Sequence, residues 1–245
     1  MSKNAFHQIG YQFQGPQQMA QFIEKHAAEF NTIPTPVGGA YSVLTTANCA
    51  QIIAQYDPQH HLIGCLPHIA GNSAIEAKIS DTLEDPRHPL DGIVLADFVS
   101  TDVPFAFDCP MYRVHQQQLL PERVHKLQIC AFPMQAEVFK NEKQFKKSPY
   151  GKFASDGCFI PNGLFRPDNK PVEKPMPFAI MTGTVTASHH MKNKLTKRTF
   201  WHCELATYGG SITTAFDASD VKVKPTKGTL LGGTFRLSAL PVAGS

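Results

Sequence analysis

The stretch RTFWHCELATYGGSITTAF, residues 198–216, decides the fold class of this chain. Two runs of alternating residues flank the sequence YGG at 208–210, and a glycine pair between two such runs predicts a tight β-hairpin turn. Alternation places two sets of side chains on opposite faces of the first strand: Trp201, Cys203 and Leu205 on one, and Phe200, His202 and Glu204 on the other. This part of the chain is therefore expected to be a β-sheet.

Two more strand candidates surround this hairpin. FAIMTGTVTAS at 178–188 precedes it, and GGTFRLSAL at 232–240 follows it behind a glycine-rich turn. The order of these four strands resembles a small OB-fold-like β-barrel over residues 178–245. The resemblance lies in strand order, and it comes with no residue signature of a named OB family.

The remaining sequence predicts a second, mixed domain. Residues 16–31 carry apolar side chains at helical spacing behind Pro16, which predicts an amphipathic helix. Short β-like runs follow at 41–46, 51–56, 61–66, 74–80, 92–99 and 125–131, and KNEKQFKKS at 140–148 has the composition of a short exposed helix. Five prolines fall between residues 159 and 177, which is typical of an extended linker. We therefore expect a β-rich α+β chain with an acidic α+β domain at 1–160, a linker at 161–177 and the barrel at 178–245.

Composition indicates an ordinary globular protein. The chain has 245 residues, of which 42% are hydrophobic and 18% are charged, and this is enough to bury a core. The N-terminus has no basic start followed by an apolar run, and the uncharged residues 30–56 are interrupted by prolines and polar side chains, so neither a secretory signal nor a membrane span is predicted. The six cysteines form no CxxC pair, which favours reduced thiols and a cytoplasmic location.

Charge is distributed unevenly along the chain. Residues 1–139 hold seven basic and thirteen acidic side chains, whereas residues 140–201 hold twelve basic and four acidic ones. A basic block can attract phosphates or an acidic protein surface, and it can also be a solvated surface or one that faces the acidic half.

The densest part of the basic block lies in the predicted loop between the first two barrel strands. Many OB-folds use this loop to hold single-stranded nucleic acid or sugars, with basic groups on phosphates and aromatic rings stacked on bases. Trp201 shares its face with Cys203 and Leu205, which favours a core position for its ring. The candidate ligand-binding residues are His189, His190, Lys192, Lys194, Lys197 and Arg198, with Phe200 and Tyr208 behind them.

Metal and cofactor sites are not predicted. His189, His190, His202 and Cys203 are zinc-ligand types, but His202 and Cys203 are adjacent in a strand and point to opposite faces, and the spacing matches no zinc template. Cys65 and His68 in GCLPH have finger-like spacing without a second pair. An acidic group could supply ligands to Mg²⁺ or Ca²⁺, but its sequence is more typical of polar turns: Asp81, Glu84, Asp85, Asp91, Asp97 and Asp102.

Catalytic motifs are also missing from the sequence. It contains no GxSxG, no GxxxxGK[ST] and no GxGxxG behind a strand. Cys109 in FDCPMYRVH could act as a nucleophile with His115 as its base, although triad members usually converge from distant segments, and a buried or turn-capping role fits Asp108 and Cys109 better.

Several phrases, among them LDGIVLADF, VPFAFDCP, FIPNGLF, GTVTASHHMKN and TYGG, resemble uncharacterised bacterial proteins of similar layout. This resemblance implies a bacterial cytoplasmic protein and no particular activity. We expect a non-enzymatic binding protein whose basic barrel loop contacts an acidic partner, either nucleic acid or protein. The alternatives are a hydrolase that uses Cys109 and His115 or an acidic metal site, and a structural assembly component.

Overall fold

The computed structural model describes residues 5–152, 157–162, 164 and 175–242. The chain opens with two helices, α1 (Ala5–Gln8) and α2 (Pro16–Lys25), and a single 3-10 turn, η1 (Ala27–Glu29). The helix predicted at 16–31 is confirmed as α2 and η1, and Pro16 fits its first turn because that turn has no partner for the missing N–H. No helix in these described ranges is long and apolar enough to span a membrane.

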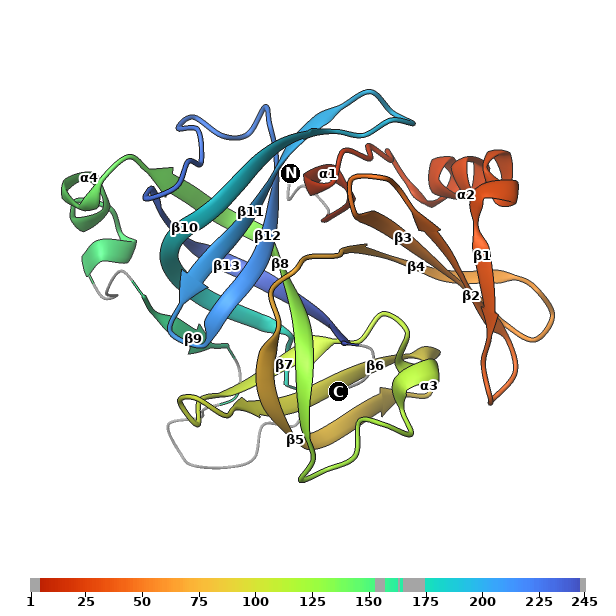
Figure 1. Ribbon diagram of the computed structural model, residues 1–245. Coiled ribbons are helices and arrows are strands. Elements are labelled where there is room, and N and C mark those ends of the chain that lie inside the picture. The colour runs from red at the N-terminus through yellow and green to blue at the C-terminus, as the bar shows by residue number, and fades with distance from the viewer. Residues whose placement is uncertain (1–4, 153–156, 163, 165–174, 243–245) are drawn as a thin grey trace.

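An antiparallel sheet of four strands follows the helices. Its strands lie in chain order, β1 (Asn31–Pro34), β2 (Ala40–Thr45), β3 (Ala50–Tyr56) and β4 (Leu62–Ile69). Figure 1 shows this sheet as a separate layer beside the larger body of the molecule.

The larger body is a second sheet that closes on itself. Its strands are β5 (Ile75–Asp85), β6 (His88–Phe98), β7 (Pro104–Asp108), β8 (Val124–Phe139), β9 (Phe159–Pro161), β10 (Phe178–Lys192), β11 (Thr199–Thr207), β12 (Gly210–Asp217) and β13 (Leu230–Pro241). Three short helices lie in its connections: α3 (Tyr112–His115), α4 (Glu142–Lys146) and η2 (Tyr150–Lys152). Pairings of β10 with β11 and of β8 with β13 close the sheet into two rings.

Each ring contains five strands, and two strands belong to both. The first ring consists of β5, β6, β7, β13 and β8, and the second ring consists of β10, β11, β12, β8 and β13. β8 and β13 pair with each other from Leu127 with Pro241 to Phe139 with Leu230. The two rings are therefore joined along the two strands that they share (Figure 1).

The strand order is the same in both rings. Each begins with an antiparallel meander of three strands, whose third strand pairs in parallel with a shared strand: β12 with β8 at Thr213 and Thr214, and β7 with β13 at Asp108. Residues 124–139 lie in the predicted N-terminal domain and residues 230–241 in the predicted barrel, yet each range supplies a strand to both rings.

One apolar core fills both rings. It includes the first-ring aromatic side chains Phe98, Phe105 and Phe107 and the second-ring residues Cys203 and Leu205. A second cluster lies outside the second ring, where the N-terminal segment packs on β8, β11 and β12; its members include Phe6, Ile9, Tyr11, Phe132, Phe200 and Ala215. The outer face of the second ring is thus covered by residues 5–11 and by the four-stranded sheet.

Local sequence patterns identified most of these elements. The alternation predicted at 74–80 is confirmed in β5, where Ile75, Ala77 and Ile79 are buried between more exposed residues, and the hairpin at 198–216 is confirmed by the antiparallel pairing of β11 with β12. The structure is β-rich with few helices, as predicted. β7 and the second half of β8 were not predicted. Within the linker predicted at 161–177, residues 163 and 165–174 lie outside the described residues.

Candidate nucleic-acid interface

The predicted basic loop is a rigid hairpin between β10 and β11. Asn193 is fully buried at its base, and its side-chain oxygen accepts hydrogen bonds from the backbone N–H groups of Leu195 (3.0 Å) and Thr196 (3.2 Å). Its amide nitrogen donates to the carbonyl of Ile9 (3.2 Å), and the Thr196 hydroxyl donates to the carbonyl of Gly10 (2.6 Å). These bonds fasten the loop to the N-terminal segment.

Within this loop the basic side chains divide into two kinds. Arg198 donates to Gln12 (2.6 Å) and to the carboxylate of Asp217 (3.2 Å), so its charge is compensated and its position fixed. Lys192, Lys194 and Lys197 are exposed, and none of them forms an ion pair with any of the described residues. The loop therefore presents three uncompensated positive charges on a rigid support.

A second lysine-bearing segment lies beside the loop. Residues 218–229 connect β12 with β13, and this connection starts where the backbone N–H of Ala218 donates to the carbonyl of Thr199 (3.2 Å). Its three lysines, Lys222, Lys224 and Lys227, are exposed. Between them, Val221 and Val223 pack against the core of the rings and anchor the segment. Figure 1 shows both segments at the upper end of the second ring.

An aromatic pair lies at the same end of the ring. His190 and Trp201 are cross-strand neighbours on β10 and β11, with ring centroids 4.7 Å apart and an interplanar angle of 36°. Trp201 is half-buried against the core, whereas His190 is exposed. The two rings are tilted against each other, and the exposed ring of His190 can contact a further planar ring.

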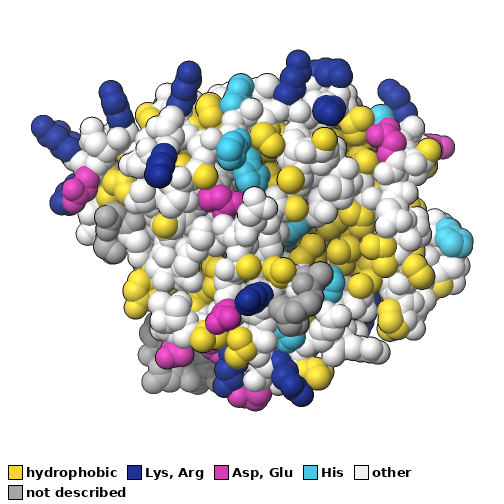
Figure 2. Space-filling model, viewed as in Figure 1, with side chains coloured by type: hydrophobic (Ala, Val, Ile, Leu, Met, Phe, Trp, Pro, Cys, Tyr) yellow, Lys and Arg dark blue, Asp and Glu magenta, His cyan; other side chains and the backbone are white. Residues whose placement is uncertain are grey.

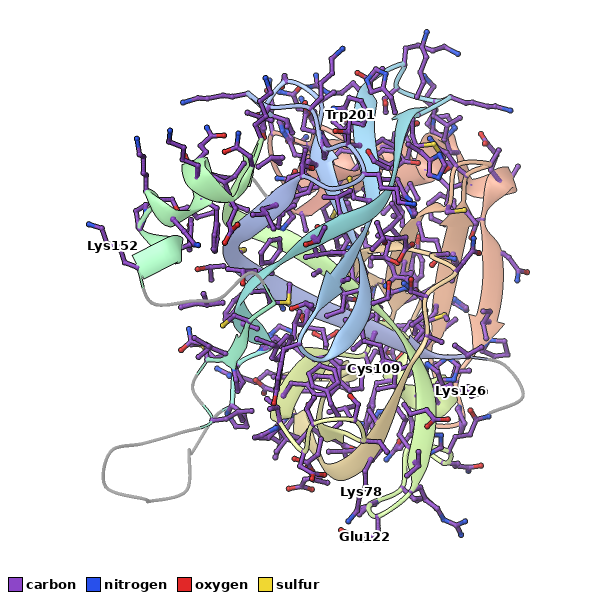
Figure 3. The ribbon with its side chains drawn as sticks, turned by 60° about the vertical axis from the view of Figure 1, so that its left-hand side comes forward. Lys78, Cys109, Glu122, Lys126, Lys152 and Trp201 are labelled. Carbon is purple, nitrogen blue, oxygen red and sulfur yellow. The ribbon has the colours of Figure 1, made fainter. Side chains whose placement is uncertain are left out.

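Charged side chains are arranged differently at the two ends of the molecule. Figure 2 shows Lys and Arg side chains spread along the upper edge with few acidic neighbours, and mixed charges at the lower end. At the lower end Lys78 forms an ion pair with Glu122 (2.5 Å), and Figure 3 shows this pair at the end opposite Trp201, with Lys126 higher up in the lower half of the molecule. Exposed lysines without an ion pair among the described residues therefore gather at the upper end, and a further set surrounds α4: Lys140, Lys143, Lys147 and Lys152.

The other predicted ligand-binding residues do not all join this surface. His189 is exposed on β10 beside His190. Phe200 is fully buried and packs in the cluster with the N-terminal segment, so it offers no surface to a ligand. Tyr208 is exposed, but it lies in the β11–β12 turn at the far end of β11 from the basic loop. We therefore remove Phe200 and Tyr208 from the candidate interface.

The histidines and cysteines of this region do not converge. Cys203 points into the core, while His202 on the opposite face donates from Nε2 to the carbonyl of Ala70 (3.4 Å). Among the residues that the structure describes, no three His, Cys, Asp or Glu side chains are placed to hold a metal ion. Two acidic residues of the predicted turn region are engaged by arginines, Glu84 by Arg113 (2.8 Å) and Asp85 by Arg87 (2.7 Å).

Cys109 is poorly suited to act as a nucleophile. It is buried in the core of the first ring (Figure 3), and burial raises the pKa of its thiol to about 12. The reactive form of a cysteine is the thiolate, which is scarce at neutral pH when the pKa is this high. His115 is also half-buried, and desolvation lowers its pKa.

Sequence analysis missed the contribution of residues 218–229. The signal is present in VKVKPTK, where valines that pack on the core alternate with lysines that face solvent. Its position beside the basic loop follows from the pairing of β12 with β11, which sequence spacing alone does not give.

No protein-family model matches the sequence, and no curated protein matches it either.

Proposed function

We propose that this chain is a binding protein for single-stranded nucleic acid, and that the upper end of the second ring is the contact surface. The observation that carries this proposal is the set of uncompensated lysines on two segments at one end of the second ring, 192–197 and 222–227, together with the ring pair of His190 and Trp201 at the same end. Lysines bind phosphates without regard to sequence, and exposed aromatic rings stack on unpaired bases.

The topology of the second ring supports this assignment. A three-stranded antiparallel meander, a parallel junction and two antiparallel strands follow the order of a five-stranded OB-fold, with β8 taking the place of the last strand. We infer that the ring is an OB-fold-like barrel in which that strand comes from earlier in the chain. The basic hairpin then corresponds to the loop between the first two strands, which OB-folds use for oligonucleotides.

The contact surface is the end of the ring and not its side. In OB-folds the face of the second and third strands also binds ligands, but here residues 5–11 cover the outer side of β11 and β12. An acidic protein is a less suitable partner than nucleic acid, because it would use the lysines but not the exposed ring of His190.

The test is fluorescence anisotropy with a fluorescein-labelled oligothymidine of about 20 nucleotides over a salt series. Each phosphate contact on a single strand contributes about 0.7 to the slope of log Kobs against log salt. The triple variant Lys192→Gln, Lys194→Gln, Lys197→Gln is expected to lower this slope by about 2. Base stacking near Trp201, the only tryptophan of the chain, is expected to quench its fluorescence.

A matched control removes three basic side chains from the first ring: Lys78→Gln, Arg123→Gln, Lys126→Gln. This variant changes the net charge equally and is expected to retain the wild-type slope. Competition with polyglutamate distinguishes a nucleic-acid partner from an acidic protein partner. A site for acidic proteins would bind polyglutamate and oligonucleotide equally tightly. Absence of binding at low salt, or equal losses in both triple variants, would contradict the proposal.

A further inference from the structure

A chain of buried polar side chains crosses from the four-stranded sheet into the shared strands. His68 on β4 is only 1% exposed. Its Nδ1 lies 3.1 Å from the Oγ of Ser238 on β13, and its Nε2 lies 2.8 Å from the Oε1 of Gln128 on β8. The hydroxyl of Ser238, the imidazole of His68 and the amide of Gln128 thus form one hydrogen-bonded series across three strands.

The direction of these hydrogen bonds follows from the donor and acceptor types. The amide nitrogen of Gln128 donates to the Thr213 hydroxyl (3.4 Å), which donates in turn to the Glu204 carboxylate (3.1 Å). The Oε1 of Gln128 therefore accepts, so the Nε2 of His68 is protonated.

The other ring nitrogen of His68 is then an acceptor. Desolvation lowers the pKa of His68 to about 4, so the ring is neutral at physiological pH and its Nδ1 is free of a proton. The Ser238 hydroxyl must donate to Nδ1. A serine that donates to a histidine, which donates in turn to a third group, is the arrangement of an activated nucleophile.

Ser238 also faces a cavity. The cavity has a volume of about 360 Å³ and lies between β4 and the shared strands. Its lining is mostly apolar, with Phe6, Cys65, Leu66, Pro67, Phe132 and Met134. Its polar members, besides Ser238, are Asp108 and Arg236. A site of this size and composition suits a small molecule with an apolar body.

Arg236 supplies positive charge beside the hydroxyl. It lies two residues before Ser238 on β13, so both side chains point to the same face of the strand. Its Nε donates to Asp108 (2.5 Å), and its two Nη groups have no hydrogen-bond partner within the described ranges. Free guanidinium N–H groups can stabilise negative charge on an oxygen atom of a ligand.

We propose that Ser238 is the nucleophile of an esterase site that acts on small esters with an apolar acyl group, with His68 as general base. Gln128 is a positioning residue, since it acts on substrate only through His68. This site goes beyond the nucleic-acid surface and involves none of its lysines.

The reaction proceeds in two balanced stages. The Ser238 Oγ attacks the ester carbonyl carbon, and its proton passes to the Nδ1 of His68 while an Arg236 Nη binds the oxyanion. The alcohol leaves with that proton, and acyl-Ser238 remains. Water then attacks the acyl group and gives one proton to His68. The Ser238 Oγ leaves and takes that proton, and the carboxylic acid is released and loses its own proton to solvent.

The test is covalent labelling with an alkyl fluorophosphonate, followed by intact-mass measurement and peptide mapping. We expect one phosphonyl group on Ser238, with loss of fluoride, and no label on Ser238→Ala. Ser148→Ala is the matched control, because the Ser148 hydroxyl is equally buried but donates to the carbonyl of Phe145 (2.7 Å) and not to a histidine. This control should label like the wild type.

Two measurements address the role of His68. His68→Gln is expected to slow labelling on the order of 100-fold. In the wild type the labelling rate should be constant from pH 8 to pH 6 and fall near pH 4, below the range of an ordinary exposed histidine, so the proposal stays testable even if His68→Gln does not fold. No label on Ser238 in folded protein, or a rate that falls near pH 6.5, would overturn the proposal and leave the hydrogen bonds with a purely structural role.

Discussion

The two rings share their strand order and differ in how their ends are charged. At the first ring, several charged side chains form ion pairs, such as Lys78 with Glu122 and Arg113 with Glu84, whereas Arg123 and Lys126 are exposed without one among the described residues. At the upper end of the second ring, the lysines of 192–197 and 222–227 have no acidic partner among the described residues. The strands are fixed by the common core, whereas loops are free to vary and bear function. The difference supports our proposal that binding belongs to the second ring.

The shared strands β8 and β13 are expected to couple the stabilities of the two rings. β8 and β13 pair from Leu127 with Pro241 to Phe139 with Leu230 and form part of the wall of each ring. A ring that lost its own three-stranded meander would leave both shared strands with an open edge. We therefore expect the rings to unfold in one transition, in spite of their different ends.

The largest expected effect comes from emptying the core of the first ring. Phe105 is fully buried and stacks on Phe98 with ring centroids 4.1 Å apart. Phe105→Ala is expected to lower the free energy of unfolding by about 3–5 kcal/mol, through lost burial and the cavity left behind. Trp201 lies in the second ring, so its fluorescence in a urea titration shows whether the distant ring is affected.

Circular dichroism in the same titration follows both rings. We expect the two midpoints to shift together in Phe105→Ala, and also in Leu205→Ala, which empties the second ring. If Phe105→Ala moved the dichroism midpoint and left the Trp201 midpoint in place, the rings would unfold independently, and the shared strands would not couple them.

A smaller effect is expected from the buried histidine that joins the four-stranded sheet to both rings. The folded-state pKa of His68 is about 4, against 6.5 for an ordinary histidine. The unfolded chain therefore binds more protons between these values, so stability is lost as pH falls from about 6.5 to about 4. The loss amounts to about 3 kcal/mol at the lower limit.

Urea titrations at pH 7 and pH 4.5 measure this loss. The variant His68→Gln cannot take up the proton and should show a flatter pH dependence than the wild type, whatever its stability at pH 7. His88→Gln, at an exposed histidine, should retain the wild-type dependence. An equal pH dependence in all three proteins would show that His68 is not the group responsible.

Local pattern predicted those parts of the fold in which one strand face is exposed. β5, β11 and β12 were found because buried residues alternate with polar ones or flank a glycine turn. The second half of β8 carries Pro133, which lacks an N–H and is normally excluded from central strands. It is tolerated here next to a bulge at Thr234 and Phe235. Ring closure also depends on partners more than 90 residues apart, such as Leu127 and Pro241, which no local pattern specifies.

The two candidate sites also differed in how far the sequence alone could predict them. The lysines of 192–197 lie in one loop, so composition alone pointed to them. Ser238, His68 and Gln128 come from three strands, with His68 separated from its two partners by 170 and 60 residues. Sequence analysis noticed His68 only as half of a weak zinc motif, because nothing in its surroundings indicates which strands will face it.

The smallest change in stability is expected from a variant of Asn193. This variant tests whether the hydrogen-bonded loop of the second ring contributes to binding. Asn193→Ala removes two hydrogen bonds within the loop and one between the loop and the N-terminal segment. This change is expected to cost roughly 1–2 kcal/mol, because buried backbone groups lose their partners. The lysines remain but are held less firmly, so oligothymidine affinity should fall several-fold with an unchanged salt slope, since the number of phosphate contacts is the same. Asn141→Ala is the control: it removes the side-chain cap of α4 (3.0 Å to the N–H of Gln144) at a cost of about 1 kcal/mol and should leave affinity unaltered. If Asn193→Ala bound as tightly as Asn141→Ala, charge alone would account for binding, and the rigid hairpin would serve only the stability of the ring.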